Sequence, residues 1–136
     1  AQAIPVVASP ACSAEQRQAV ELFLIGMDMI PIWSKDHPGL YVIRSIAMLV
    51  NAACEAVLHD IASEQDIDSA MKYGVNYPCG PFEWADKIGY YTILQILENM
   101  YRIYGEDRYR TSIYLAKKAV QGHAQKTQQQ PLRVAG

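Results

Sequence analysis

A long apolar stretch dominates the middle of the chain. Residues 40–61 contain no proline or glycine, and four of their polar residues recur at intervals of seven, four and four: Arg44, Asn51, Glu55 and His59. On a helix of 3.6 residues per turn these four lie in one narrow stripe, and most of the remaining circumference is apolar. The pattern predicts one long central helix whose polar stripe faces solvent or a neighbouring domain.

Capping signals and shorter apolar faces predict further helices on both sides. Ser13 stands three residues before Gln16, the spacing of a capping box, and Ser63 stands three residues before Asp66. Pro81 fits a first helical turn. Helices are expected over about 14–25, 64–73, 81–88, 93–104 and 112–121, each ended by the glycine that follows: Gly26, Gly74, Gly89, Gly105 and Gly122.

Strand character is confined to two short runs near the N-terminus. Residues 4–8 form a β-like run, and residues 29–34 read as an edge strand or an extended linker because a proline interrupts them. The predicted fold is all-α, a helical bundle of about five to six helices around one long central helix, with a short extended lead-in. We expect a strand-helix-strand lead-in over 1–34, a helical domain over 35–123 and a disordered tail over 124–136.

Composition narrows the class of protein only slightly. The 136 residues are 51% apolar and carry a net charge of -2, so no basic surface predicts binding to nucleic acid or to a membrane. Three widely spaced cysteines, Cys12, Cys54 and Cys79, indicate free thiols and a cytoplasmic location. The longest apolar stretch is interrupted by polar residues, which argues against a membrane span.

Candidate sites for a nucleotide or a metal are missing from the sequence. None of the eight glycines has another glycine two residues away, as a dinucleotide-binding loop requires. The histidines at 37, 59 and 123 lack a second histidine or cysteine three or four residues on. Asp66 and Asp68 lack the glycine and the distal glutamate of a calcium loop. We therefore predict no metal and no cofactor in this chain.

Two patterns leave a chemical role open beside a structural one. His59 follows Glu55 by one helical turn, which could orient an imidazole for acid–base work, but the periodicity favours a polar stripe that faces solvent or a neighbouring domain. His37 reads as a loop residue. Six tyrosines cluster late in the chain and favour core or interface packing, with hydroxyls toward water, over a ligand platform: Tyr90, Tyr91, Tyr101, Tyr104, Tyr109 and Tyr114.

A series of motifs resembles the C-terminal domain of the 3-hydroxyacyl-CoA dehydrogenase family. The matching segments are 35–40, 62–74, Tyr77-Pro78-Cys79-Gly80-Pro81-Phe82 with the residues to 86, Gly89 and 104–110, about 80 residues in all. The family pattern assigns structural positions to eight residues: Pro38, Gly39, Arg44, Tyr77, Pro78, Gly80, Pro81 and Phe82.

The resemblance implies a helical domain that follows an NAD-binding Rossmann domain, forms a homodimer contact and closes one wall of the acyl-CoA cleft. The family's catalytic histidine and glutamate belong to the Rossmann domain. Its one catalytic asparagine from the helical domain lies in a Pro-Gly-Phe-x-x-Asn-Arg pattern, and here Ile43 occupies that position. An alkyl side chain donates no hydrogen bond to a developing oxyanion.

Further departures indicate a second, degenerate copy of the domain, as in dehydrogenases of phenylacetate and aromatic-acid breakdown. The family's glycine-rich ending is replaced by a glutamine-rich one, and the lead-in is similar to a Rossmann terminal strand-helix-strand. The parent would oxidise 3-hydroxyacyl-CoA to 3-oxoacyl-CoA with NAD, and this chain would supply dimerisation and support without catalysis. The alternative is a stand-alone helical protein-binding module.

Overall fold

The computed structural model describes residues 1–36 and 40–128, and the chain divides into two compact units, Ala1–His37 and Pro38–Gly136. His37, predicted as a loop residue, and the family positions Pro38 and Gly39 lie outside the described residues, as do residues 129–136 of the predicted tail.

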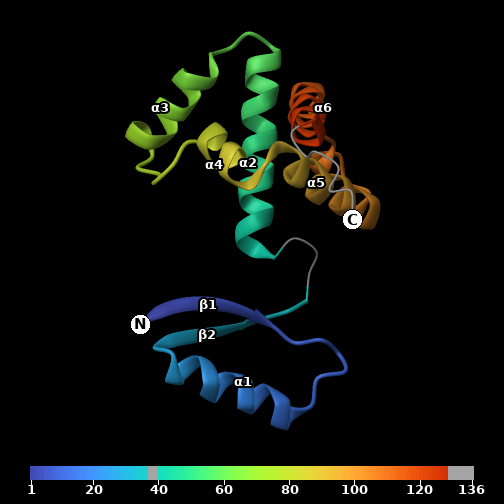
Figure 1. Ribbon diagram of the computed structural model, residues 1–136. Coiled ribbons are helices and arrows are strands. Elements are labelled where there is room, and N and C mark those ends of the chain that lie inside the picture. The colour runs from blue at the N-terminus through green and yellow to red at the C-terminus, as the bar shows by residue number, and fades with distance from the viewer. Residues whose placement is uncertain (37–39, 129–136) are drawn as a thin grey trace, which may run out of the picture. The chain divides into compact units, whose positions relative to one another are not determined.

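The first unit is a strand-helix-strand, as its sequence predicts. Strands β1 (Gln2–Val7) and β2 (Met29–Ser34) pair in parallel, in a register that runs from Gln2 opposite Met29 to Val7 opposite Ser34. Helix α1 (Ala14–Gly26) connects them and packs against β2 (Figure 1). The capping box is confirmed, because Ser13 Oγ accepts from the Gln16 amide at 3.2 Å and Gln16 Oε1 accepts from the Ser13 amide at 2.9 Å.

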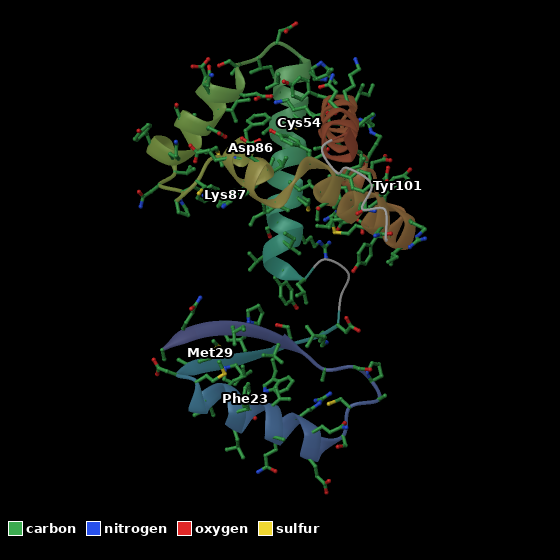
Figure 2. All side chains as sticks on the ribbon, in the orientation of Figure 1. Phe23, Met29, Cys54, Asp86, Lys87 and Tyr101 are labelled. Atoms are coloured by element: carbon green, nitrogen blue, oxygen red, sulfur yellow. The ribbon has the colours of Figure 1, made fainter. Side chains whose placement is uncertain are left out.

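This unit has little core of its own. None of its described residues is buried, and large apolar side chains of α1 stay open to solvent, with Leu22 63% and Phe23 66% exposed. Figure 2 labels Phe23 on α1 and Met29 on β2. Two parallel strands and one helix are too few to shield their apolar faces from solvent. Parallel strands therefore normally occur in larger sheets whose two faces are covered by helices.

The second unit is a helical bundle built around α2 (Tyr41–Leu58). Around it come α3 (Glu64–Gly74), α4 (Pro81–Ile88), α5 (Tyr90–Tyr104), a short 3-10 helix η1 (Asp107–Tyr109) and α6 (Ile113–Gln128). Figure 1 shows α2 between α3 on one side and α5 and α6 on the other. The predicted central helix is confirmed. By length and composition α2 could cross a membrane, and four of its apolar residues, Ala47, Val50, Ala53 and Cys54, are buried in the core that it forms with α4, α5 and α6.

Two helix ends differ from the sequence predictions. Helix α2 ends at Leu58 instead of Ile61 because Asp60 adopts a left-handed φ of 54°. The amides of Asp60 and Ile61 then bond back to the carbonyls of Val57 and Ala56, which is a Schellman ending. Helix α6 runs through Gly122 to Gln128, since good helix formers on both sides make one interior glycine tolerable.

Candidate functional site

The start of α2 is the candidate site, because it holds the position that would face a substrate in the resembled family. Leu40 is the N-cap with a φ of 45°, and no side chain caps this helix end. Ile43 lies in the first turn and is partly buried, beside Tyr41 and Val42, which are 61% and 64% exposed. The side chains here are apolar or phenolic, and Ile43 itself offers no donor or acceptor.

Arg44 holds this helix start against the rest of the bundle. Its guanidinium carbon lies 5.2 Å from the centre of the Tyr104 ring and 5.0 Å from that of Tyr109. The two rings also pack on each other with centroids 5.5 Å apart, and a guanidinium beside tyrosine rings at these distances is an attractive cation–π arrangement. The family residue Arg44 therefore acts here as a packing residue, at the junction of α2, α5 and η1.

Asn51 is not part of a solvent-facing stripe, and the prediction for it was wrong. It is 7% exposed, donates from Nδ2 to the Arg110 carbonyl at 2.9 Å and accepts at Oδ1 from the Ser112 amide at 2.8 Å. Its amide thus satisfies two backbone groups in the turn between η1 and α6, which cannot reach a helical partner. Helical periodicity placed Asn51 beside polar neighbours but could not reveal the chain segment that packs over it.

His59 and Glu55 form a surface pair. Their Nε2 and Oε2 atoms lie 3.4 Å apart, and the two side chains are 66% and 35% exposed. No cavity described in this unit includes either residue. The solvent-facing interpretation therefore holds for this pair, and His37 lies outside the described residues.

The segment Tyr77-Pro78-Cys79-Gly80-Pro81-Phe82 closes onto α3 through backbone hydrogen bonds. Asp68 accepts from the amides of Phe82 at 2.8 Å and Glu83 at 3.1 Å, which satisfies the first turn of α4. A Cβ at Gly80 would lie 2.2 Å from Asp68 Cγ, so only glycine fits. The Tyr77 ring packs on Trp84 with centroids 5.7 Å apart. Asp68 is thus a helix-capping residue, a role that its spacing from Asp66 did not indicate.

A cluster around Lys118 was missed at the sequence level. Its ammonium pairs with Glu64 and lies over the rings of Tyr90 at 5.2 Å, Tyr114 at 5.6 Å and Phe82 at 5.9 Å. The Tyr114 hydroxyl donates to Glu64 Oε1 at 2.6 Å. These groups join four helices that are distant in sequence, so no local pattern could have predicted them.

Electrostatics in and near this cluster keep the Cys54 thiol and the Tyr114 phenol protonated. Burial, reinforced by the charges of Glu64 and Glu55, raises the pKa of the Cys54 thiol to about 12, and Figure 2 shows Cys54 inside the helical unit. The hydrogen bond to Glu64 raises the pKa of Tyr114 to about 12. Burial alone would raise the pKa of Glu64, but the hydrogen bonds from Lys118 and Tyr114 outweigh it and lower that pKa. Cys54 and Tyr114 therefore stay in their protonated, weakly nucleophilic forms near neutral pH.

The described residues contain no group of three or more histidine, cysteine, aspartate or glutamate side chains that could hold a metal ion. The turn from β1 to α1 has no glycine, and Ser13 caps the first turn of α1. The residues present therefore do not fit the pyrophosphate of a dinucleotide, which needs close backbone approach at an open helix N-terminus.

Residues 39–133 match the family model described as 3-hydroxyacyl-CoA dehydrogenase, C-terminal domain. The chain belongs to this family. The 3-hydroxyadipyl-CoA dehydrogenase of Escherichia coli is 47% identical over 85 residues, which are 62% of this chain and 18% of that protein. A probable 3-hydroxybutyryl-CoA dehydrogenase of Deinococcus radiodurans is 37% identical over 92 residues, 68% of this chain and 33% of the relative.

Solved structures of the family share this fold. The 3-hydroxybutyryl-CoA dehydrogenase of Escherichia coli superposes with a TM-score of 0.84 at 34% identity, over 91% of this chain and 26% of that one. The (S)-3-hydroxybutyryl-CoA dehydrogenase of Ralstonia eutropha gives a TM-score of 0.80 at 30% identity, over 87% of this chain and 42% of that one. The chain thus spans less than half the length of these relatives.

Proposed function

We propose that this chain is a non-catalytic helical module of an NAD-dependent 3-hydroxyacyl-CoA dehydrogenase, supplying dimer contacts and structural support. The observation that carries the proposal is Ile43, an alkyl side chain in the first turn of α2 at the position of the family's asparagine. Oxidation of a 3-hydroxyl group builds charge on its oxygen, and a catalytic group there must donate or accept a hydrogen bond.

None of the described side chains at this helix start carries a carboxamide. Leu40 and Val42, close to Ile43, are alkyl residues, Tyr41 carries a phenol, and Arg44 lies over two tyrosine rings. His59 is the histidine whose side chain the structure describes, and it lies at the other end of α2. The acid–base work of the parent reaction would therefore come from another part of the parent protein, as would binding of NAD.

The first unit has the features expected of the last part of a larger parallel sheet. Its parallel strands leave apolar residues such as Ile30 and Ile32 53% and 52% exposed. These features suit the last strand-helix-strand of an upstream Rossmann domain, in which further strands and helices would cover them. We place the parent in the cytoplasm, in keeping with three free cysteines.

Activity of the purified chain tests the catalytic part of the proposal. Incubation with NADH and acetoacetyl-CoA should show no oxidation of NADH beyond a buffer control, for the chain as it is and for Ile43→Asn. A cooperative unfolding transition would show that both proteins are folded. Turnover clearly above the control by the unmodified chain would overturn the proposal.

The dimer part has its own test. Apolar side chains on α2, α5 and α6 stay exposed, among them Tyr41, Ile103, Ile113 and Val120, and exposed apolar surface is typical of contact sites. Sedimentation equilibrium of the parent protein with and without this module should show loss of dimer when the module is removed. A parent that dimerises equally well without it would contradict the dimer role.

A reading frame with no Rossmann domain would favour a stand-alone binding module instead.

A further inference from the structure

A cavity of about 470 Å³ lies in the first unit, and every residue that lines it belongs to that unit. It is lined by residues that follow the two strands, Ala8 and Pro10 after β1 and Lys35 and Asp36 after β2. Because the strands are parallel and Val7 pairs with Ser34, the carboxyl ends of both strands lie at the same edge of the sheet. In open α/β sheets, small ligands bind in the crevice outside the carboxyl ends of the strands.

The cavity carries two cations and one carboxylate. Arg17, on α1, lines the cavity. Lys35 and Asp36, which directly follow β2, line it as well. Within residues 1–36 the structure pairs neither Arg17 nor Lys35 with a carboxylate; the ion pair of this unit joins the N-terminal amine to Asp28. The lining side chains Arg17, Lys35 and Asp36 therefore carry a net positive charge, and no ion pair within residues 1–36 offsets it.

One cation is already oriented by an aromatic ring. The Arg17 guanidinium carbon lies 5.9 Å from the centre of the Trp33 ring, and Trp33, 36% exposed, also lines the cavity. Stacking on an indole restrains the guanidinium while its N–H groups stay free to donate. A guanidinium fixed in this way, with an ammonium beside the same cavity, matches the planar or tetrahedral oxygens of a small anion.

We propose that this cavity binds a small oxyanion, the phosphate or carboxylate group of a metabolite, between Arg17 and Lys35 at the carboxyl ends of β1 and β2. The proposed binding groups are the side chains of Arg17 and Lys35, and the Gln16 amide at the start of α1 is already bonded to Ser13 Oγ. The inference does not depend on the role proposed for the helical unit, because every lining residue lies in the first unit.

Nuclear magnetic resonance on the full 136-residue chain tests the site with inorganic phosphate and, separately, acetate. Each titration is compared with sodium chloride at equal ionic strength. At least one oxyanion should shift the Trp33 indole N–H and the Arg17 and Lys35 amide signals in a saturable way. Saturation by phosphate alone would identify a phosphoester as the ligand group, and saturation by acetate alone a carboxylate.

Substitutions that remove either a positive or a negative charge from the lining make the test specific to this cavity. Arg17→Gln and Lys35→Gln should each weaken binding about tenfold, because each removes a charge-assisted hydrogen bond. Asp36→Asn should strengthen it, because a repelling charge is lost. Lys117→Gln, in the helical unit, is the matched control and should change nothing. Lys35 lies outside any helix or strand, so its replacement leaves the fold intact. Shifts that chloride reproduces, or binding that both Arg17→Gln and Lys35→Gln leave unchanged, would overturn the proposal.

Discussion

Single polar groups inside the helical unit decide much of its stability. Asn51 satisfies two backbone groups across the core, whereas the Tyr109 hydroxyl is buried and has no hydrogen-bond partner among the described residues. Tyr114 is the contrasting case, since its hydroxyl donates to Glu64. Tyrosine was predicted to keep its hydroxyl in water, and the structure contradicts this for Tyr109 and for Tyr114.

Replacing these two tyrosines by phenylalanine should change stability in opposite directions. Tyr109→Phe should raise the free energy of unfolding by about 1 kcal/mol, because an unpaired buried hydroxyl is removed. Tyr114→Phe should lower it by about 1 kcal/mol, because the bond to the Glu64 carboxylate is lost. Urea denaturation followed by circular dichroism measures both. A loss of stability in Tyr109→Phe would mean that its hydroxyl has a partner.

Glu64 should make stability depend on pH in the acid range. Its pKa is lowered in the folded chain from the ordinary value of 4.5. A depressed folded pKa stabilises the fold fully above the unfolded pKa, and this contribution is lost as pH falls from about 4.5 through the folded pKa. The stability difference between the wild type and Glu64→Gln should therefore shrink as pH falls in this range. Glu98→Gln, exposed on α5, serves as the control, and a difference for Glu64→Gln that stays constant with pH would contradict the assignment.

At the scale of whole elements, the helices differ in what fixes their ends. Helix α1 is fixed by its own capping box, which is local in sequence. Helix α4 begins where Asp68 of α3 accepts its first amides, and Gly80 gives Asp68 room to do so. Helix α6 needs no terminator at Gly122, where a side chain would meet open space. The same residue type is therefore required at one helix and dispensable at another.

Alanine substitutions at these two glycines should separate the roles. Gly80→Ala should lower the free energy of unfolding by about 2 kcal/mol, because the new methyl group displaces Asp68 from two amides. Gly122→Ala should raise it by about 0.5–1 kcal/mol, because alanine has the higher helix propensity. Thermal unfolding of the two variants and the wild type measures both signs. Equal effects of the two substitutions would show that the surroundings of the glycines do not matter.

At the scale of the molecule, the two units carry very different shares of the core. All buried apolar residues of the described chain lie between Ala47 and Ala119, in the helical unit. The strand-helix-strand unit exposes apolar side chains that need further cover. We therefore expect the helical unit to fold by its own packing.

Removal of the first unit should leave the helical unit folded. A chain that begins at Lys35 should keep a cooperative urea transition with a midpoint close to that of the full chain, because no residue of the buried core is lost. Circular dichroism at 222 nm follows the transition. A non-cooperative, gradual loss of signal would show that the helical core depends on residues 1–34.

The sequence by itself determined the class and order of the elements. Apolar periodicity defined the central helix, Ser13 and Gln16 defined the start of α1, and the motif series indicated the family. These signals are local, so they survive without knowledge of the fold. Ile43 was likewise visible as an alkyl residue at the position where the resemblance implies an asparagine.

Only the tertiary structure decided which side chains meet. It buried Asn51 under the turn between η1 and α6, joined Asp68 to the amides of α4, and placed Lys118 over three rings with Glu64 beside it. Each of these contacts joins residues from different elements, and their partners depend on how helices pack. Sequence spacing along one helix carries no information on the element that covers it, which is the physical reason these roles could not be predicted.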